Sequence, residues 1–272
     1  IEARIIPYLK LEKEYDYYYE HYNEYYQLRF KIGATKFYAL GNKVNKLIDT
    51  YHTDGSIKFG KDFVYNNRKY YFNTKSKQML DLLELSYAKT SYYKNFLIPT
   101  KTIFDRLLLI IDDIYVEAPC INKVLPIVKG LPFNYKVLKK DNTHTINIDY
   151  DLTLLKPLTA DYSYLIDNNA IYKLNEVEKI IAENILEEEI DQLTFSNQEF
   201  QDFKDYLVPS IKNKMILDDS VDDLVIVNTP DVKLYFDILE DYIEGKIIFK
   251  YKDREINYFD KEDKVIVRDK QF

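Results

Sequence analysis

Residues 63–73 read FVYNNRKYYFN, and residues 164–175 read YLIDNNAIYKLN, so two distant stretches of the chain share one pattern. In both, aromatic and β-branched residues flank an Asn-Asn pair, and Asn tolerates positive φ angles better than most residues. The pattern predicts that each pair closes a β-hairpin. Each stretch also contains an Asn suited to begin a helix, Asn73 in the first and Asn175 in the second.

A pair of helices is predicted after each stretch. The first pair consists of a leucine-rich run and the segment IPTKTIFDRLLLI at 98–110. The second pair begins at Glu176 and continues with FSNQEFQDFKDYLV at 195–208. Three helix starts show the spacing of a capping box, in which a small polar residue precedes an acidic residue by three positions. These are Thr102 with Asp105, Asn175 with Glu178, and Ser196 with Glu199.

Segments with alternating apolar residues precede, separate and follow these two stretches. The chain is therefore predicted to be α+β, with antiparallel β meanders and hairpins and with helix pairs interspersed between them. The repeated order suggests an internal duplication. We expect residues 1–120 to form the first module of meander, hairpin and helices, and residues 121–272 to form the second module with a terminal β meander.

The composition indicates a folded chain. It has 272 residues, of which 46% are hydrophobic, and this is enough to bury a substantial core. A single cysteine, Cys120, excludes an internal disulfide framework, and no apolar run has the roughly 18 residues needed for a membrane helix. With no leader visible and no initiator Met, we expect a cytoplasmic piece of a longer polypeptide that has no membrane partner.

The net charge of −7 is unevenly distributed along the sequence. Residues 176–206 hold ten acidic residues and two lysines, whereas residues 56–77 hold six basic residues and one Asp. Phosphate neutralisation supplies most non-specific affinity for DNA, so the basic stretch is the better candidate for phosphate contacts. The candidate residues are Lys58, Lys61, Arg68, Lys69, Lys75 and Lys77.

A tyrosine-rich run near the start is the other candidate for binding bases, since aromatic side chains can stack on them. It contains Tyr15, Tyr17, Tyr18, Tyr19, Tyr22, Tyr25 and Tyr26. Acidic residues are interleaved with these tyrosines, among them Glu14, Asp16 and Glu20, and carboxylates repel phosphates. The run is therefore the weaker candidate for binding nucleic acid.

No catalytic, cofactor-binding or metal-binding residues are predicted. The six glycines do not have the spacing of a phosphate-binding loop. His21, His52, His144 and Cys120 are isolated from one another in the sequence. The aspartates at 218, 219, 222 and 223 lack the spacing of a calcium loop and are better explained as a solvated connection. A hydrolase would need two carboxylates that converge in a cleft, which no pattern here indicates.

Several stretches, taken in order, resemble the helicase-associated domain of bacterial Swi/Snf-type ATP-dependent DNA translocases, particularly those of low-GC Gram-positive bacteria. They are FYAL (37–40), SIKFGKDFVYN (56–66), LTLLKPLTADYSYLIDNNAIYKL (152–174), FSNQEFQDFKDYLVP (195–209), FKYKDREINYF (249–259) and VIVRDKQF (265–272). The resemblance extends over nearly the whole chain, and it rests on patterned hydrophobic segments rather than on a catalytic signature.

The resemblance implies a non-catalytic accessory domain that lies between a zinc-finger region and a two-lobed helicase motor. The expected partner is the motor of the same polypeptide, and DNA or another protein are further candidates. In that family nucleotide chemistry belongs to the motor, so the resemblance transfers no catalytic residue and no cofactor. The alternative is a stand-alone protein-interaction scaffold that is unrelated to nucleic acid.

Overall fold

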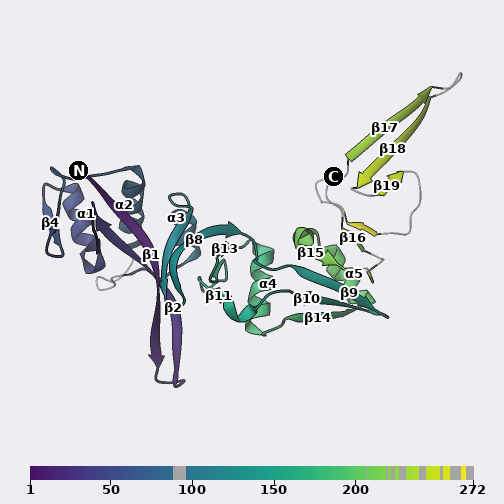
Figure 1. Ribbon diagram of the computed structural model, residues 1–272, viewed down its shortest axis with the longest axis horizontal. Coiled ribbons are helices and arrows are strands. Elements are labelled where there is room, and N and C mark those ends of the chain that lie inside the picture. The colour runs from purple at the N-terminus through teal and green to yellow at the C-terminus, as the bar shows by residue number, and fades with distance from the viewer. Residues whose placement is uncertain are drawn as a thin grey trace. The chain divides into compact units, whose positions relative to one another are not determined.

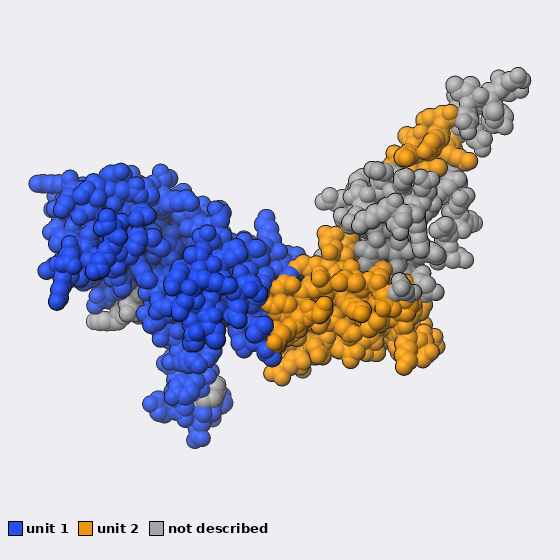
Figure 2. Space-filling model, viewed as in Figure 1, with its two compact units in different colours: residues 1–131, 153–183 blue, residues 132–152, 184–272 orange. Residues whose placement is uncertain are grey.

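The computed structural model describes residues 1–87, 96–206, 208–218, 220–221, 224–226, 231–238, 243–251, 254–257 and 265–267. The chain is an α+β protein with two compact units, as predicted for its fold class (Figure 1). Unit 1 consists of residues 1–131 and 153–183, and unit 2 of residues 132–152 and 184–272 (Figure 2). The chain therefore passes between the units three times.

A nine-stranded sheet forms the centre of unit 1. Its strands are ordered β11-β12-β13-β8-β7-β1-β2-β3, and β6 pairs with β1 beside this path. The bounds are β1 (Glu2–Asp16), β2 (His21–Gly33), β3 (Phe37–Ala39), β6 (Tyr71–Phe72), β7 (Asp113–Ala118), β8 (Ile121–Lys129), β11 (Lys156–Pro157), β12 (Tyr164–Ile166) and β13 (Ile171–Lys173).

Within each meander of this sheet the pairing is antiparallel, as predicted: β1 with β2, β2 with β3, β7 with β8, β11 with β12 and β12 with β13. The joins between distant segments are parallel instead. Strand β1 pairs parallel with β6 and β7, and β8 pairs parallel with β13. The sequence did not indicate these joins, because periodicity identifies a strand but not its distant neighbour.

Three helices come before β7 in unit 1, and each has buried residues: α1 (Val44–His52), α2 (Thr74–Tyr87) and α3 (Lys101–Leu107). One core cluster contains Leu9 and Leu28 of the sheet together with Leu47, Leu83 and Phe104 of the helices, each completely removed from solvent. Burying such side chains contributes about 1.5–3 kcal/mol each. The hydroxyl of Ser76, on α2, accepts a hydrogen bond from the Ile5 amide of β1 at 3.2 Å, which joins this helix to the sheet.

The prediction that the first Asn-Asn pair closes a hairpin is wrong. Strand β5 (Phe63–Asn66) pairs antiparallel with the preceding β4 (Ser56–Phe59), and β6 pairs with β1. The second Asn of the pair instead makes hydrogen bonds to the end of α1: Asn67 Nδ2 donates to the carbonyls of Thr50, Tyr51 and Thr53 at 2.7–3.1 Å. Asn67 thus satisfies carbonyls at the end of α1, which have no partner within the helix.

The second Asn-Asn stretch does form the predicted hairpin, in which β12 and β13 pair antiparallel. Its turn depends on the residue before the pair as well. Asp167 Oδ1 accepts hydrogen bonds from the amides of Asn169 and Ala170, at 2.7 and 2.8 Å. The two stretches therefore share an order of strand, turn, strand and helix but differ in strand pairing.

The predicted helix starts are confirmed with one correction. Asn73 Oδ1 accepts from the Ser76 amide, and Asn175 and Glu178 form a reciprocal capping box at the start of α4 (Glu176–Glu187). Helix α3 is capped by Thr100, whose hydroxyl accepts from the Ile103 amide, and not by Thr102. The sequence offered two threonines, and only the path of the chain decided between them.

Unit 2 contains a four-stranded sheet with the order β14-β10-β9-β15. The bounds are β9 (Tyr135–Lys140), β10 (Thr143–Ile148), β14 (Gln192–Ser196) and β15 (Met215–Leu217). Helices α5 (Asn197–Tyr206) and α6 (Val208–Ile211) follow β14, and the Ser196–Glu199 capping box begins α5 as predicted. Strand β14 separates α4 from α5, so the second predicted helix pair is interrupted by a strand.

The remaining strands of unit 2 form two small sheets, one with β16 and β20 in parallel and one with the order β17-β18-β19. Their bounds are β16 (Leu224–Ile226), β17 (Asp231–Ile238), β18 (Ile243–Tyr251), β19 (Arg254–Asn257) and β20 (Val265–Val267). The predicted second meander is divided, because β8 belongs to unit 1 whereas β9 and β10 belong to unit 2. Compactness alone does not test a duplication, so the module boundary at residue 120 stays a prediction.

Candidate functional site

The six predicted phosphate contacts all lie on one stretch of unit 1, and all six side chains are exposed. Lys58 is on β4 and Lys61 is in the turn that leads to β5. Arg68 and Lys69 lie in the turn after β5, and Lys75 and Lys77 lie in the first turns of α2. We call residues 56–77 the basic segment.

The fold of the β4–β5 hairpin explains why these cations face solvent. Its register places Ile57 opposite Tyr65 and Phe59 opposite Phe63, and all four of these side chains are buried. Because side chains alternate between the two faces of a strand, Lys58 must lie on the other face. The turn needs Gly60, whose φ is +61°, and a Cβ atom there would lie 2.5 Å from the ring of Tyr38.

Two of the cations already have partners in unit 1. Arg68 Nη2 lies 2.8 Å from Asp54 Oδ2, in a pair whose side chains are 78% and 69% exposed. Such exposed pairs contribute about 1 kcal/mol at most and exchange readily with solvent. Lys69 Nζ lies 5.4 Å from the centroid of the Tyr70 ring. Both contacts leave the charge at the surface, where an external anion can approach it.

The structure adds a cation that the sequence reasoning missed. Lys43 lies outside the basic segment, yet its Nζ donates to the carbonyl of Lys58 at 2.6 Å and lies 5.6 Å from the Phe59 ring. Only tertiary contact brings this residue to the hairpin. Counting from 36 to 77, the sequence holds nine Lys and Arg residues and three Asp residues, so the positive charge extends beyond the predicted stretch.

The aromatic residues of the basic segment are not a stacking surface as a group. Tyr65 is 1% exposed, and burial raises its pKa to about 12. Its ring stacks on Phe72, with centroids 4.9 Å apart. Tyr70 is half-buried, and Tyr71 is exposed. Of the three tyrosines among the cations, Tyr65 therefore supports the hairpin from inside the core, and only Tyr71 is exposed.

In the tyrosine-rich run, by contrast, most of the tyrosines are exposed. Strands β1 and β2 pair from Arg4 to Asp16, and residues 17–20 form the turn between them. Tyr26 lies in the stem and is buried, and Tyr25 is half-buried. The other five tyrosines are exposed, and we call them the tyrosine tip: Tyr15, Tyr17, Tyr18, Tyr19 and Tyr22.

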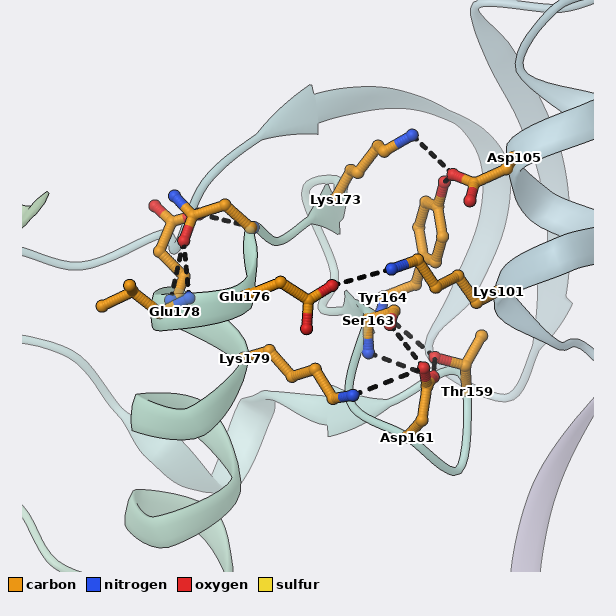
Figure 3. A network of polar contacts seen from close by, with 12 residues as sticks. Lys101, Asp105, Thr159, Asp161, Ser163, Tyr164, Lys173, Glu176, Glu178 and Lys179 are labelled. Atoms are coloured by element: carbon orange, nitrogen blue, oxygen red, sulfur yellow. Dashed lines mark hydrogen bonds and ion pairs between the residues drawn. The ribbon is translucent and has the colours of Figure 1, made fainter.

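A network of polar contacts joins α3, the β12–β13 hairpin and α4 within unit 1 (Figure 3). Asp105 Oδ1 of α3 accepts from the Tyr164 hydroxyl at 2.7 Å and pairs with Lys173 Nζ at 2.5 Å. Lys101, one turn earlier on α3, pairs with Glu176 of α4 at 2.8 Å. Helix α3 is thereby tied both to the hairpin of the second Asn-Asn stretch and to α4, the helix that follows it.

Asp161 holds the other side of the network, in the loop before β12. Its carboxylate accepts from the hydroxyls of Thr159 and Ser163, at 2.8 and 2.6 Å, and lies 3.7 Å from Lys179 Nζ. Burial acts to raise the pKa of Asp161, but the hydrogen bonds from Ser163 and Thr159 outweigh it, so the pKa lies below its ordinary value.

The charges in this network suit a structural role. Burial acts to raise the pKa of Asp105, yet the hydrogen bonds from Lys173 and Tyr164 lower it overall, and the hydrogen bond from Lys101 lowers the pKa of Glu176. The carboxylates of Asp105, Asp161 and Glu176 are therefore all ionised at neutral pH, so none of them holds a proton to donate. Burial and the hydrogen bond to Asp105 raise the pKa of Tyr164. The network stabilises the packing of three elements and has no arrangement of a general acid beside a base.

No group of three or more His, Cys, Asp or Glu side chains that could hold a metal ion occurs within the described ranges. Of the predicted acidic connection, Asp219, Asp222 and Asp223 lie outside the described residues. Asp218 is described, and its carboxylate accepts from the Ser220 amide at 3.1 Å. None of the helices whose residues the structure describes is long and apolar enough to cross a lipid bilayer.

Comparison with known proteins defines the class of this chain. A model of the family described as "Bacterial SNF2 helicase associated" matches residues 94–271, which is more than half of the chain. The chain belongs to this family of helicase-associated domains, as the ordered stretches of the sequence indicated. No curated protein and no solved structure matches the chain significantly.

The matched region begins after the basic segment and after the tyrosine tip. It contains α3, the β12–β13 hairpin and the polar network of Figure 3, together with unit 2 up to residue 271. The basic segment and the tyrosine tip therefore both lie in the part of the chain outside the match.

Proposed function

We propose that this chain is a non-catalytic accessory domain that positions or regulates an ATP-dependent DNA motor in the same polypeptide, and that its basic segment contacts DNA phosphates. Membership of the helicase-associated family supports the link with the motor. The observation that carries the DNA contact is the set of six exposed cations on the β4–β5 hairpin, the turn after it and the start of α2, where the other face of the hairpin is anchored in the core. The expected location is the cytoplasm, where a bacterial motor meets its DNA.

The architecture favours contact with the phosphate backbone over base readout. The cations sit on a short hairpin, its turns and the start of a helix, and the aromatic rings near them are largely buried. Phosphate contacts fix a protein on DNA but carry no sequence information. Binding by the basic segment should therefore be independent of the DNA sequence. It should also be weak, because the net charge of the whole chain is −7 and repels DNA.

The DNA contact is tested by replacing four cations at once. In the variant K58Q/K61Q/R68Q/K69Q, we expect low-salt affinity for duplex and single-stranded DNA to fall to the limit of detection in fluorescence anisotropy. The slope of log Kobs against log salt should fall by about 0.9 for each duplex phosphate that the variant no longer neutralises.

A matched variant controls for the change in net charge. Lys123, Lys129, Lys136 and Lys156 are all exposed and lie outside the basic segment, so K123Q/K129Q/K136Q/K156Q removes the same charge elsewhere. This control should keep most of the affinity. Equal losses in the two variants, or no salt-dependent binding by the wild-type chain, would exclude the basic segment as a DNA contact. The accessory role would then act through the motor alone.

The accessory role itself has a separate test in the parent motor protein. The isolated chain should show no ATP turnover with or without DNA, since its glycines do not form a phosphate-binding loop. Removing the chain from the parent should change the DNA-stimulated ATPase rate or its coupling to movement along DNA. An ATPase rate and a translocation rate that both stay unchanged would contradict a positioning or regulatory function.

A further inference from the structure

The tyrosine tip is the most exposed aromatic cluster among the described residues of unit 1. The side chains of Tyr17 and Tyr18 are 87% and 84% exposed, and those of Tyr19 and Tyr22 are 69% and 65% exposed. Single exposed aromatics are ordinary on protein surfaces, but a contiguous group marks a site of interaction. The tip therefore needs an explanation beyond the folding of the hairpin.

The β1–β2 ribbon carries this cluster away from the rest of unit 1. Strand β7 pairs with β1 only at Tyr8, Leu9 and Lys10, and β3 pairs with β2 only from Lys31 to Gly33. Beyond these pairs, residues 11–16 and 21–26 form a ribbon of two strands that projects from the body of unit 1 (Figures 1 and 2). Both faces of a projecting ribbon can meet a partner.

The tip is pre-arranged for contact. Asp16 Oδ1 accepts from the amides of Tyr18 and Tyr19, at 2.8 and 3.2 Å, which fixes the turn. The Tyr15 ring packs edge-on against both Tyr17 and Tyr22 at 5.0 Å, and Tyr18 packs edge-on against Tyr19 at 4.8 Å. A rigid aromatic surface loses little entropy when it binds, and tyrosine is enriched at the energetic centres of interfaces.

The charge of the tip selects the partner. Residues 12–24 hold five acidic residues and one lysine, and that lysine, Lys13, already pairs with Glu24. Glu14 and Glu20 are exposed beside the tyrosines. Carboxylates interleaved with aromatic rings repel phosphates, but they attract guanidinium groups, which also stack on aromatic faces. Charge complementarity therefore favours a basic polypeptide over a nucleic acid.

We propose that the tyrosine tip is a docking site for an arginine-rich polypeptide surface. The rings of Tyr17, Tyr18 and Tyr19 receive the guanidinium planes, and the carboxylates of Glu14, Asp16 and Glu20 supply the counter-charge. Arginine should be preferred to lysine, because only its planar group combines stacking with paired hydrogen bonds. This inference does not depend on the DNA contact of the basic segment.

The test measures anisotropy of a fluorescein-labelled peptide of alternating Arg and Ser, with the whole 272-residue chain. Comparison probes are an alternating Lys and Ser peptide, an alternating Glu and Ser peptide, and oligo-thymidylate. The variant Y17S/Y18S/Y19S should weaken binding of the Arg peptide by roughly tenfold and abolish its advantage over the Lys peptide. The single change Tyr18→Ser, in the turn, should weaken it by a few-fold without affecting the thermal midpoint.

Two charge variants separate the tip from the general acidity of the chain. In E14Q/D16N/E20Q, the amide introduced by D16N keeps an oxygen that can accept from the two turn amides, so the variant removes charge and retains the turn. It should weaken binding at low salt and have little effect at high salt. The control E187Q/E188Q/E189Q removes three exposed charges from α4 and the residues after it, and it should leave binding unchanged.

Three results would overturn the proposal. Loss of Arg-peptide binding in E187Q/E188Q/E189Q but not in the tip variants would mean that the peptide binds to the acidic surface of the chain in general and not to the tip. Loss of oligo-thymidylate binding in the tyrosine variants would make the tip a nucleic-acid surface. Self-association of the wild-type chain that the tip variants abolish, with Arg-peptide binding unchanged, would make a second copy the occupant.

Discussion

Two β-hairpins of unit 1 use tyrosine in opposite ways. In the β4–β5 hairpin the aromatic residues face the core and the cations face solvent. In the β1–β2 ribbon the tip tyrosines face solvent, and carboxylates accompany them. The number of tyrosines in a stretch therefore says little about binding. What decides the role is whether another layer of the protein covers that face of the hairpin.

The two hairpins differ in how much of the protein packs against them. The β4–β5 hairpin lies against α1 and the core cluster, so alternate side chains have a layer to pack on. The distal part of the ribbon extends past every other described strand of its sheet, and the five tyrosines of its tip are exposed. Amphipathic tyrosine is tolerated in both places, because it has an apolar ring and a polar hydroxyl.

The largest expected effect tests this contrast by truncating one tyrosine in each hairpin. Tyr65→Ala should lower the free energy of unfolding by about 3–5 kcal/mol, since it empties a buried aromatic site. Tyr18→Ala should change it by less than about 0.5 kcal/mol, because its ring is exposed. Urea denaturation of the two variants measures both values. Comparable losses would mean that the tip is packed against other residues in solution.

The next largest expected effect is a change in stability from substitutions in the turns of the two hairpins. Gly60→Ala should destabilise the chain by at least about 1–2 kcal/mol, because the residue has positive φ and the added Cβ would displace the Tyr38 ring. Glu20 already has a φ of 53°, so Glu20→Gly relieves strain and should stabilise the chain by roughly 0.5 kcal/mol after its entropy cost. Thermal midpoints that move in opposite directions would confirm this contrast.

Alkaline pH tests the burial of the phenol in the basic segment. Burial raises the pKa of Tyr65 from the ordinary 10.0 to about 12. The unfolded chain releases this proton first, so the stability contributed below pH 10 is lost as the pH rises through about 12. Tyr65→Phe should flatten the decline of stability over this window. An identical pH profile in the variant and the wild-type chain would contradict the raised pKa.

The smallest effect concerns ion pairs near each hairpin. Asp54→Asn removes the exposed partner of Arg68 and should cost less than about 0.5 kcal/mol. It should also raise low-salt affinity for DNA by roughly two- to threefold, because a cation is released for phosphate. Glu12 of the ribbon is less exposed and pairs with both Arg29 and Lys10 at 2.8 Å. Glu12→Gln should therefore cost more, about 1 kcal/mol, without improving DNA binding.

Local patterns in the sequence were reliable where the interaction itself is local. The capping boxes at Asn175 and Ser196, the hairpin at 164–175 and the α+β class all follow from residues a few positions apart. The exposure of the six cations could also be anticipated, since an unpaired cation is costly to bury. Their contact with DNA, unlike their exposure, stays a prediction.

The sequence by itself determined the class of fold, the positions of most helices and strands, and the family, because periodicity, capping and ordered apolar segments are written in neighbouring residues. Tertiary structure alone decided that Asn67 closes the end of α1 and that β6 joins β1. It also decided that Tyr65 is buried while Tyr17 is exposed. The physical reason is that partners distant in the chain compete for each backbone group and each apolar face, and a local pattern does not record which partner succeeds.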